Sequence, residues 1–142
     1  MNPQRVTLIT LGVADLAAAR AFYARLGWRE HKASQPGVAF YQMHGAVLGL
    51  FDRAALAEDQ GRPGAVLGCG ALTLAQNYAT EAQVDAAYAA ALAAGGTALK
   101  PPQKVFWGGY SGYWADPDGH VWELAMNPYW PLADDGSLTL PE

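Results

Sequence analysis

The chain has 142 residues, a formal net charge of −4 and no cluster of Lys or Arg, so nucleic acid is not an expected partner, because phosphate binding needs clustered basic side chains. About half of the residues (51%) are apolar, which suits one domain with a core of its own, and no apolar run approaches the ~18–20 residues that span a bilayer. The first five residues do not lead from a cationic segment into an apolar stretch as a signal peptide does, and we therefore expect a cytoplasmic protein without membrane contact.

The first half of the chain predicts a strand, a helix and three more strands. Residues 6–13 are rich in β-branched and aliphatic side chains, which indicates a buried strand. Asp15 suits the N-cap of the helix that follows, and Gly27 suits its C-cap. Short strands are then expected over residues 28–32, 37–43 and 46–51.

The second half repeats this order of elements. The polar stretch 53–64 indicates a short helix and then a linker. A helix is expected over residues 81–94, with Thr80 as its N-cap and Gly95-Gly96 ending it. Strands are expected at residues 70–76, 97–100, 109–115 and 120–126. The matching order favours an internal duplication over chance alternation.

Each half ends in a hairpin, and the two hairpins align on their turn glycines, Gly45 and Gly119. Both then have an aromatic strand, a short polar turn, the glycine and an apolar strand. Four residues past the glycine, the second hairpin carries Glu123 and the first carries Gly49. If the halves share a cleft, this difference decides whether the cleft can hold a metal ion.

Two segments make the chain resemble the vicinal oxygen chelate superfamily, also called the glyoxalase/bleomycin-resistance/dioxygenase fold. The first is residues 11–27, which are similar to the opening strand and helix of the family. Its matching residues are Leu11-Gly12-Val13-Ala14-Asp15-Leu16, Phe22-Tyr23 and Leu26-Gly27. The second is residues 113–124, which resemble the closing hairpin. Its matching residues are Asp116-Pro117-Asp118-Gly119-His120 and Glu123-Leu124.

The resemblance implies an α+β fold. It consists of two tandem βαβββ modules whose strands form an incomplete barrel around a cleft. Residues 1–142 would then be a single domain. Module 1 would cover about 5–53, module 2 about 68–126, and a tail 127–142.

For the metal-dependent enzymes of the family, the resemblance implies ligands on the first and last strands of each module, around a metal that acts as a Lewis acid. Glu123 occupies the last-strand position of module 2, and Gly49 occupies that of module 1. The first-strand positions fall on Leu8 and on the stretch 70–72, which has no ligand atom. We predict no cofactor, and a divalent metal held through Glu123 is disfavoured, because one carboxylate is too few ligands.

The histidines do not complete this set of ligands. His120 lies three residues from Glu123 on a predicted strand, so the two side chains point to opposite faces. His31 and His44 are expected in a loop and a turn, facing solvent. Glu123 is therefore the only residue that matches a metal-ligand position of the family, and we predict no metal site.

Aromatic residues are dense around the second hairpin, and they suit a pocket for a flat or partly apolar small molecule. The predicted ligand-binding residues are Trp107, Tyr110, Tyr113 and Glu123. Trp122 should point away from Glu123 and pack under a helix. Glu123 is also the candidate catalytic residue, because burial in an apolar cleft would fit a carboxyl group for general acid or base chemistry.

The sequence leaves two functions open. One is a metal-free, glyoxalase-like protein that binds a small molecule, as the antibiotic-resistance proteins of the superfamily do in a cleft shared by a dimer. The alternative is a metal-dependent lyase or isomerase of lactoylglutathione lyase type, with Glu123 as ligand or base. A homodimer is expected in both cases, because the resemblance implies modules that pair between chains.

Overall fold

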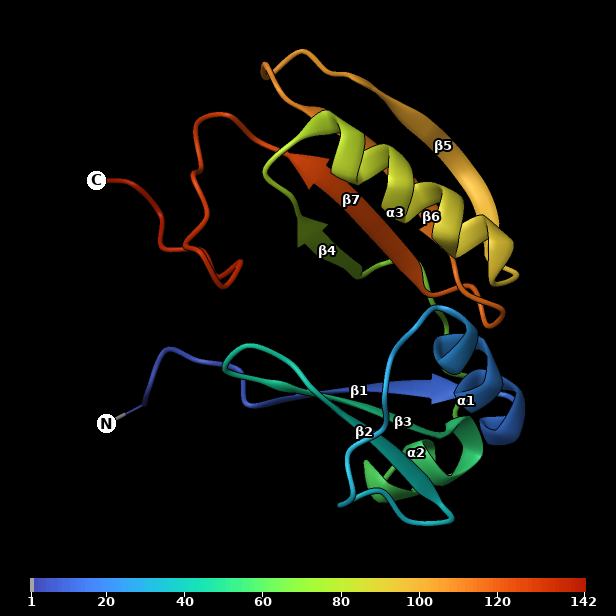
Figure 1. Cartoon of the computed structure of the whole chain (residues 1–142). Coiled ribbons are helices and arrows are strands. Elements are labelled where there is room, and N and C mark those ends of the chain that lie inside the picture. The colour runs from blue at the N-terminus through green and yellow to red at the C-terminus, as the bar shows by residue number, and fades with distance from the viewer. Residues whose placement is uncertain (1) are drawn as a thin grey trace. The chain divides into compact units, whose positions relative to one another are not determined.

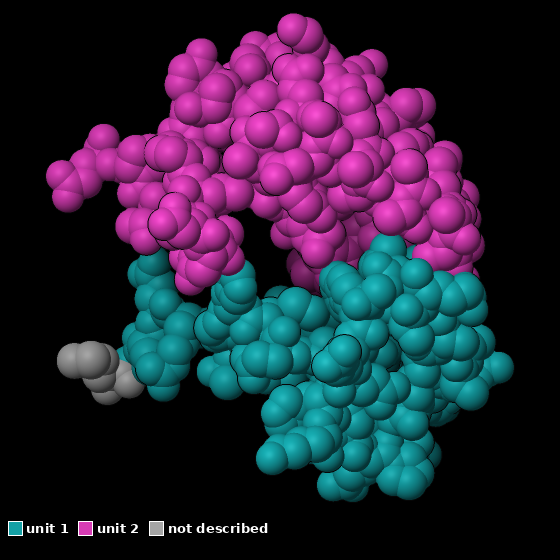
Figure 2. Space-filling view, in the orientation of Figure 1, with its two compact units in different colours: residues 1–68 teal, residues 69–142 magenta. Residues whose placement is uncertain are grey.

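The computed structural model describes residues 2–142, which divide into two compact units on either side of the Gly68–Cys69 bond (Figure 2). Each unit combines one β-sheet with one or two helices (Figure 1). The predicted α+β class and the two-module organisation are confirmed. In the described chain, no helix is long and apolar enough to cross a membrane. The cleft between the modules stays a prediction.

Unit 1 is built on a three-stranded sheet. The strand order is β1-β3-β2, with β1 parallel and β2 antiparallel to β3. Its elements are β1 (Leu8–Val13), α1 (Leu16–Arg25), β2 (Val38–Gln42), β3 (Val47–Asp52) and α2 (Arg53–Asp59). The predicted helix after residue 52 is thus present.

Helix α1 begins and ends where the sequence predicts. The Oδ1 atom of Asp15 accepts a hydrogen bond from the Ala18 N–H at 3.1 Å, and Gly27 follows the helix with a φ of 100°. Phe22 and Tyr23 on α1 are completely buried. The helix packs on β2 and β3, so these aromatic rings join one face of the sheet into the core of unit 1.

The strand predicted over residues 28–32 does not form. The His31 N–H donates to the Phe40 carbonyl at 2.7 Å. The Phe40 N–H, however, donates to the Ser34 hydroxyl at 2.9 Å rather than to a neighbouring strand. Because a side chain supplies this acceptor, a loop satisfies the edge of β2 where a fourth strand was expected.

Unit 2 is built on a four-stranded sheet with the order β4-β7-β6-β5. Helix α3 packs on β5, β6 and β7 (Figure 1). It begins at Thr80, which forms a complete capping box with Gln83. The elements are β4 (Thr73–Asn77), α3 (Glu81–Ala93), β5 (Thr97–Lys104), β6 (Tyr110–Ala115) and β7 (Val121–Met126).

Strand β5 is longer than predicted, because it continues through Pro101 and Pro102 to Lys104. It forms the edge of the sheet, and its pairing with β6 shifts register on both sides of Lys100. Proline has no N–H to donate, and it is tolerated at edges and bulges of this kind. The prolines therefore interrupt the ladder without ending the strand.

Candidate functional site

Glu123 and Tyr113 form a polar pair on the β6–β7 hairpin. The two residues lie directly opposite each other. Side chains alternate along a strand, so the pair faces away from the buried, stacked rings of Trp114 and Trp122. Burial raises the pKa of Tyr113, and the charge and hydrogen-bonding capacity of the neighbouring Glu123 carboxylate raise it further. Tyr113 therefore stays a neutral phenol at physiological pH, beside a carboxylate.

The turn of the hairpin fixes this pairing. The Asp116 carbonyl accepts from the Gly119 N–H at 2.9 Å. The Asp116 carboxylate is buried and accepts from the N–H groups of Asp118 and His120, both at 2.9 Å. The turn predicted at residues 116–119 is therefore locked by its own aspartate, which holds β6 and β7 in register.

The other two predicted ligand-binding residues, Tyr110 and Trp107, make contacts of their own. The Tyr110 hydroxyl donates to Asp85 on α3 at 2.8 Å, so this side chain is on the helix side of the sheet. The Trp107 ring lies over Gly109, where an added Cβ would be 1.7 Å from the indole. The structure thus pairs Tyr113 with Glu123 and turns Tyr110 to the opposite face of the sheet, while the Trp107 ring packs on Gly109.

Unit 1 repeats the strand pairing of unit 2 with different side chains. Gly49 on β3 lies opposite Phe40, as Glu123 lies opposite Tyr113. The alignment of the hairpins on their turn glycines therefore matches the register of the two sheets. An added Cβ on Gly49 would lie 3.4 Å from the Phe40 ring. Gly49 therefore offers no ligand atom, and the Phe40 ring lies at van der Waals distance from its Cβ position.

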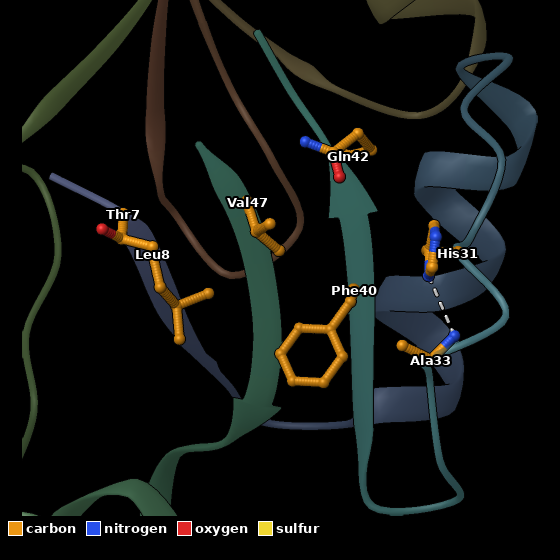
Figure 3. A pocket seen from close by; sticks show the side chains of 7 residues that line it. All are labelled: Thr7, Leu8, His31, Ala33, Phe40, Gln42 and Val47. Carbon is orange, nitrogen blue, oxygen red and sulfur yellow. Dashed lines mark hydrogen bonds between the residues drawn. The ribbon is translucent and has the colours of Figure 1, made fainter. Parts of the chain in front are cut away.

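A pocket of about 360 Å³ lies in unit 1, on the sheet face that carries Phe40 (Figure 3). We call this the pocket face. Helix α2 lies over the other end of this face, since Leu56 is 3.2 Å from the Cβ position of Gly12. The pocket is lined by Thr7, Leu8, His31, Ala33, Phe40, Gln42 and Val47.

The polar atoms at the pocket are set by local hydrogen bonds. His31 Nδ1 accepts from the Ala33 N–H at 3.0 Å (Figure 3), so in the neutral ring Nε2 carries the proton and can donate. The Gln42 amide nitrogen donates to the Met43 carbonyl at 2.9 Å and to the Ala46 carbonyl at 3.3 Å, which leaves its Oε1 as an acceptor. The lining contains no Asp, Glu, Lys or Arg.

Sequence reasoning did not find this pocket. Its walls come from β1, β2, β3 and the loop after α1, and each lining residue alone is typical of a core or a loop. A usable signal was the alternation that puts Phe40 and Gln42 on one face of β2. His31 is exposed, as expected, but it also lines the pocket.

The donor atoms present do not fit the metal site that the fold family implies. Leu8 pairs with Val47 as Thr73 pairs with Val121, so Thr73 is the module 2 counterpart of Leu8 and directly follows the predicted stretch 70–72. The four positions where the family carries its metal ligands are Leu8, Gly49, Thr73 and Glu123. Of these, Glu123 alone carries a carboxylate or an imidazole. Within either unit, as far as the structure describes it, no three His, Cys, Asp or Glu residues gather where they could hold a metal ion.

Comparisons with known proteins agree with this architecture. A glyoxalase-related enzyme from Fulvimarina pelagi is 41% identical with a TM-score of 0.90, and the match covers 99% of this chain and 100% of that one. A lactoylglutathione lyase from Agrobacterium tumefaciens is 25% identical with a TM-score of 0.68, covering 93% and 100%. None of the curated proteins compared with the chain matches it. The sequence model of the Glyoxalase/Bleomycin resistance protein/Dioxygenase superfamily matches residues 5–124, and the chain therefore belongs to this superfamily.

Proposed function

We propose that this protein binds an apolar small molecule in the pocket of unit 1 without a resident metal ion. The supporting observation concerns Leu8 and Gly49, the two residues at the positions where module 1 would carry metal ligands. Leu8 is a wall of the pocket, and Gly49 lies beside the Phe40 ring, which is another wall. Burying apolar ligand surface on these side chains contributes roughly 25 cal/mol per Å², and the volume lies at the small end of ordinary ligand pockets.

Tyr113 and Glu123 offer a separate polar contact point in unit 2. The Glu123 carboxylate can accept a hydrogen bond from a ligand, and the Tyr113 hydroxyl opposite it can donate one. We assign the polar contact to this pair rather than to Trp107 and Tyr110, whose side chains are engaged with Gly109 and Asp85.

A lyase or isomerase is the second candidate. The Glu123 carboxyl group lies opposite Tyr113 on the hairpin, where it can serve as a general base that takes a proton from a bound substrate. The similarity to a lactoylglutathione lyase is consistent with this role. The missing donors at Leu8, Gly49 and Thr73 argue against the metal-dependent form of that chemistry.

A pair of leucine variants tests the binding proposal. Leu8 in the pocket and Leu99 on β5 are similarly exposed, at 48% and 51%. A library of small ring compounds is screened by protein NMR, and hits are titrated against Leu8→Asp and Leu99→Asp. We expect Leu8→Asp to abolish binding and Leu99→Asp to leave it unchanged. Hits that bind Leu8→Asp normally would refute the pocket assignment. Turnover in a lactoylglutathione lyase assay that disappears in Glu123→Gln would support the second candidate.

A further inference from the structure

On the basis of the proposed function, we infer that the ligand of the unit 1 pocket is an uncharged ring compound that carries both a hydrogen-bond acceptor and a donor, as an aromatic or cyclic amide does. Three properties of the pocket lead to this class: the absence of charge, the aromatic floor, and lining side chains that include a hydrogen-bond donor on His31 and an acceptor on Gln42.

The absence of charge excludes ions. No acidic or basic side chain lines the pocket. The His31 ring is held by a hydrogen bond from the Ala33 N–H to its Nδ1 at 3.0 Å, an interaction that only the neutral ring can accept. An ionic group buried here would lose water without gaining an opposite charge, which is strongly unfavourable.

The shape of the floor favours a ring. The Phe40 ring covers Gly49 and occupies the middle of the pocket face (Figure 3). Leu8 and Val47 lie to one side of it, and His31 and Ala33 to the other (Figure 3). A planar ligand can stack on Phe40 in an offset or edge-to-face geometry, with an apolar edge toward the aliphatic side chains.

The polar side-chain atoms of the pocket indicate which polar group the ligand ring carries. His31 Nε2–H can donate to a carbonyl oxygen of the ligand, and Gln42 Oε1 can accept from an N–H or O–H. The other polar atoms of these two side chains are already engaged, with Ala33 and with the Met43–Ala46 turn. An amide group supplies one acceptor and one donor, whereas a hydrocarbon supplies neither and leaves both side-chain atoms without a partner.

Four probes of similar size separate these properties: benzamide, benzoate, benzylammonium and ethylbenzene. Each is titrated into ¹⁵N-labelled full-length protein, and the amide shifts of Ala33, Phe40 and Val47 report occupancy of the pocket. We expect benzamide to bind there with a Kd on the order of 1 mM, as its few atoms allow. The two ions should bind at least about tenfold more weakly, and ethylbenzene about three- to tenfold more weakly.

A histidine pair tests the donor. In His31→Asn the amide oxygen can still accept from Ala33, but the Nε2–H is lost. Benzamide should then bind about three- to tenfold more weakly, while the same change at the exposed turn residue His44 should have no effect.

The outcomes separate the two levels of the proposal. Benzoate or benzylammonium that binds the pocket as tightly as benzamide, or His31→Asn without effect, overturns the ligand class and leaves pocket binding standing. Benzamide shifts confined to residues outside the pocket also overturn the class. If none of the probes, and no hit of the wider library, shifts the pocket amides, the proposed function itself fails.

Discussion

Replacing Tyr41 with Phe is expected to stabilise the protein. Tyr41 lies on β2, is 2% exposed, and packs against Tyr23 and Trp28 with ring centroids 6.0 and 5.8 Å away. Its hydroxyl is buried and has no hydrogen-bond partner among residues 2–142. A buried hydroxyl without a partner costs about 1–3 kcal/mol. Tyr41→Phe removes that cost, so the free energy of unfolding at pH 7 should rise by about 1 kcal/mol.

The effect should grow at alkaline pH. Burial first, then the charge of Glu30, raises the pKa of Tyr41 to about 12, although Arg20 acts in the opposite direction. The unfolded chain titrates near 10, so the folded state holds this proton more tightly. The corresponding stabilisation is complete below about pH 10 and is lost as the pH rises through 12. At pH 11 the wild type should already have lost about 1.4 kcal/mol that the Phe variant keeps.

Urea denaturation followed by tryptophan fluorescence measures both effects, at pH 7 and at pH 11. Tyr78→Phe is the matched control, because the Tyr78 hydroxyl donates to Gln76 Oε1 at 3.2 Å. Its loss should destabilise the protein at pH 7 by about 0.5–1.5 kcal/mol. The reasoning is refuted if Tyr41→Phe is destabilising at pH 7, or if its advantage over the wild type is the same at both pH values.

Three further predictions concern the site and the assembly. Glu123→Gln should lower the pKa of Tyr113 toward its ordinary value without restoring it fully, because burial remains; an NMR titration of the Tyr113 ring carbons measures this, and an unchanged pKa would contradict the pairing. Gly109→Ala should cost about 1–3 kcal/mol in urea denaturation, because the new methyl group displaces the Trp107 ring, whereas Gly37→Ala meets nothing within 4 Å and should not be penalised by crowding. Light scattering should give about twice the 15.1 kDa mass of one chain, and a monomer at working concentration would refute the predicted homodimer.

Much of the fold could be predicted because its signals are local. Asp15 and Thr80 cap their helices through neighbouring N–H groups, and the turn at residues 116–119 is closed by its own aspartate. Two differences from the prediction have non-local causes. The edge of β2 is satisfied by the Ser34 hydroxyl, and β5 tolerates Pro101-Pro102 because it is an edge strand.

The candidate site was only partly predictable. Glu123 and Tyr113 were both named as candidates, and the register places them opposite each other on the hairpin. The separation of Tyr110 from Tyr113 was also accessible, because residues three apart on a strand point to opposite faces. The pocket was not predictable, because it depends on the Phe40 ring lying beside Gly49 and on the loop residue His31 lining the same face of the sheet.

Metal analysis tests the central claim most directly. The full-length protein is incubated in turn with Ni²⁺, Zn²⁺ and Mn²⁺, passed through a desalting column, and analysed for bound metal beside Glu123→Ala. Since three of the four strand positions carry Leu8, Gly49 and Thr73, the account predicts far less than one ion per chain, with no difference between the two proteins. One tightly held ion per chain that is lost in Glu123→Ala would contradict it.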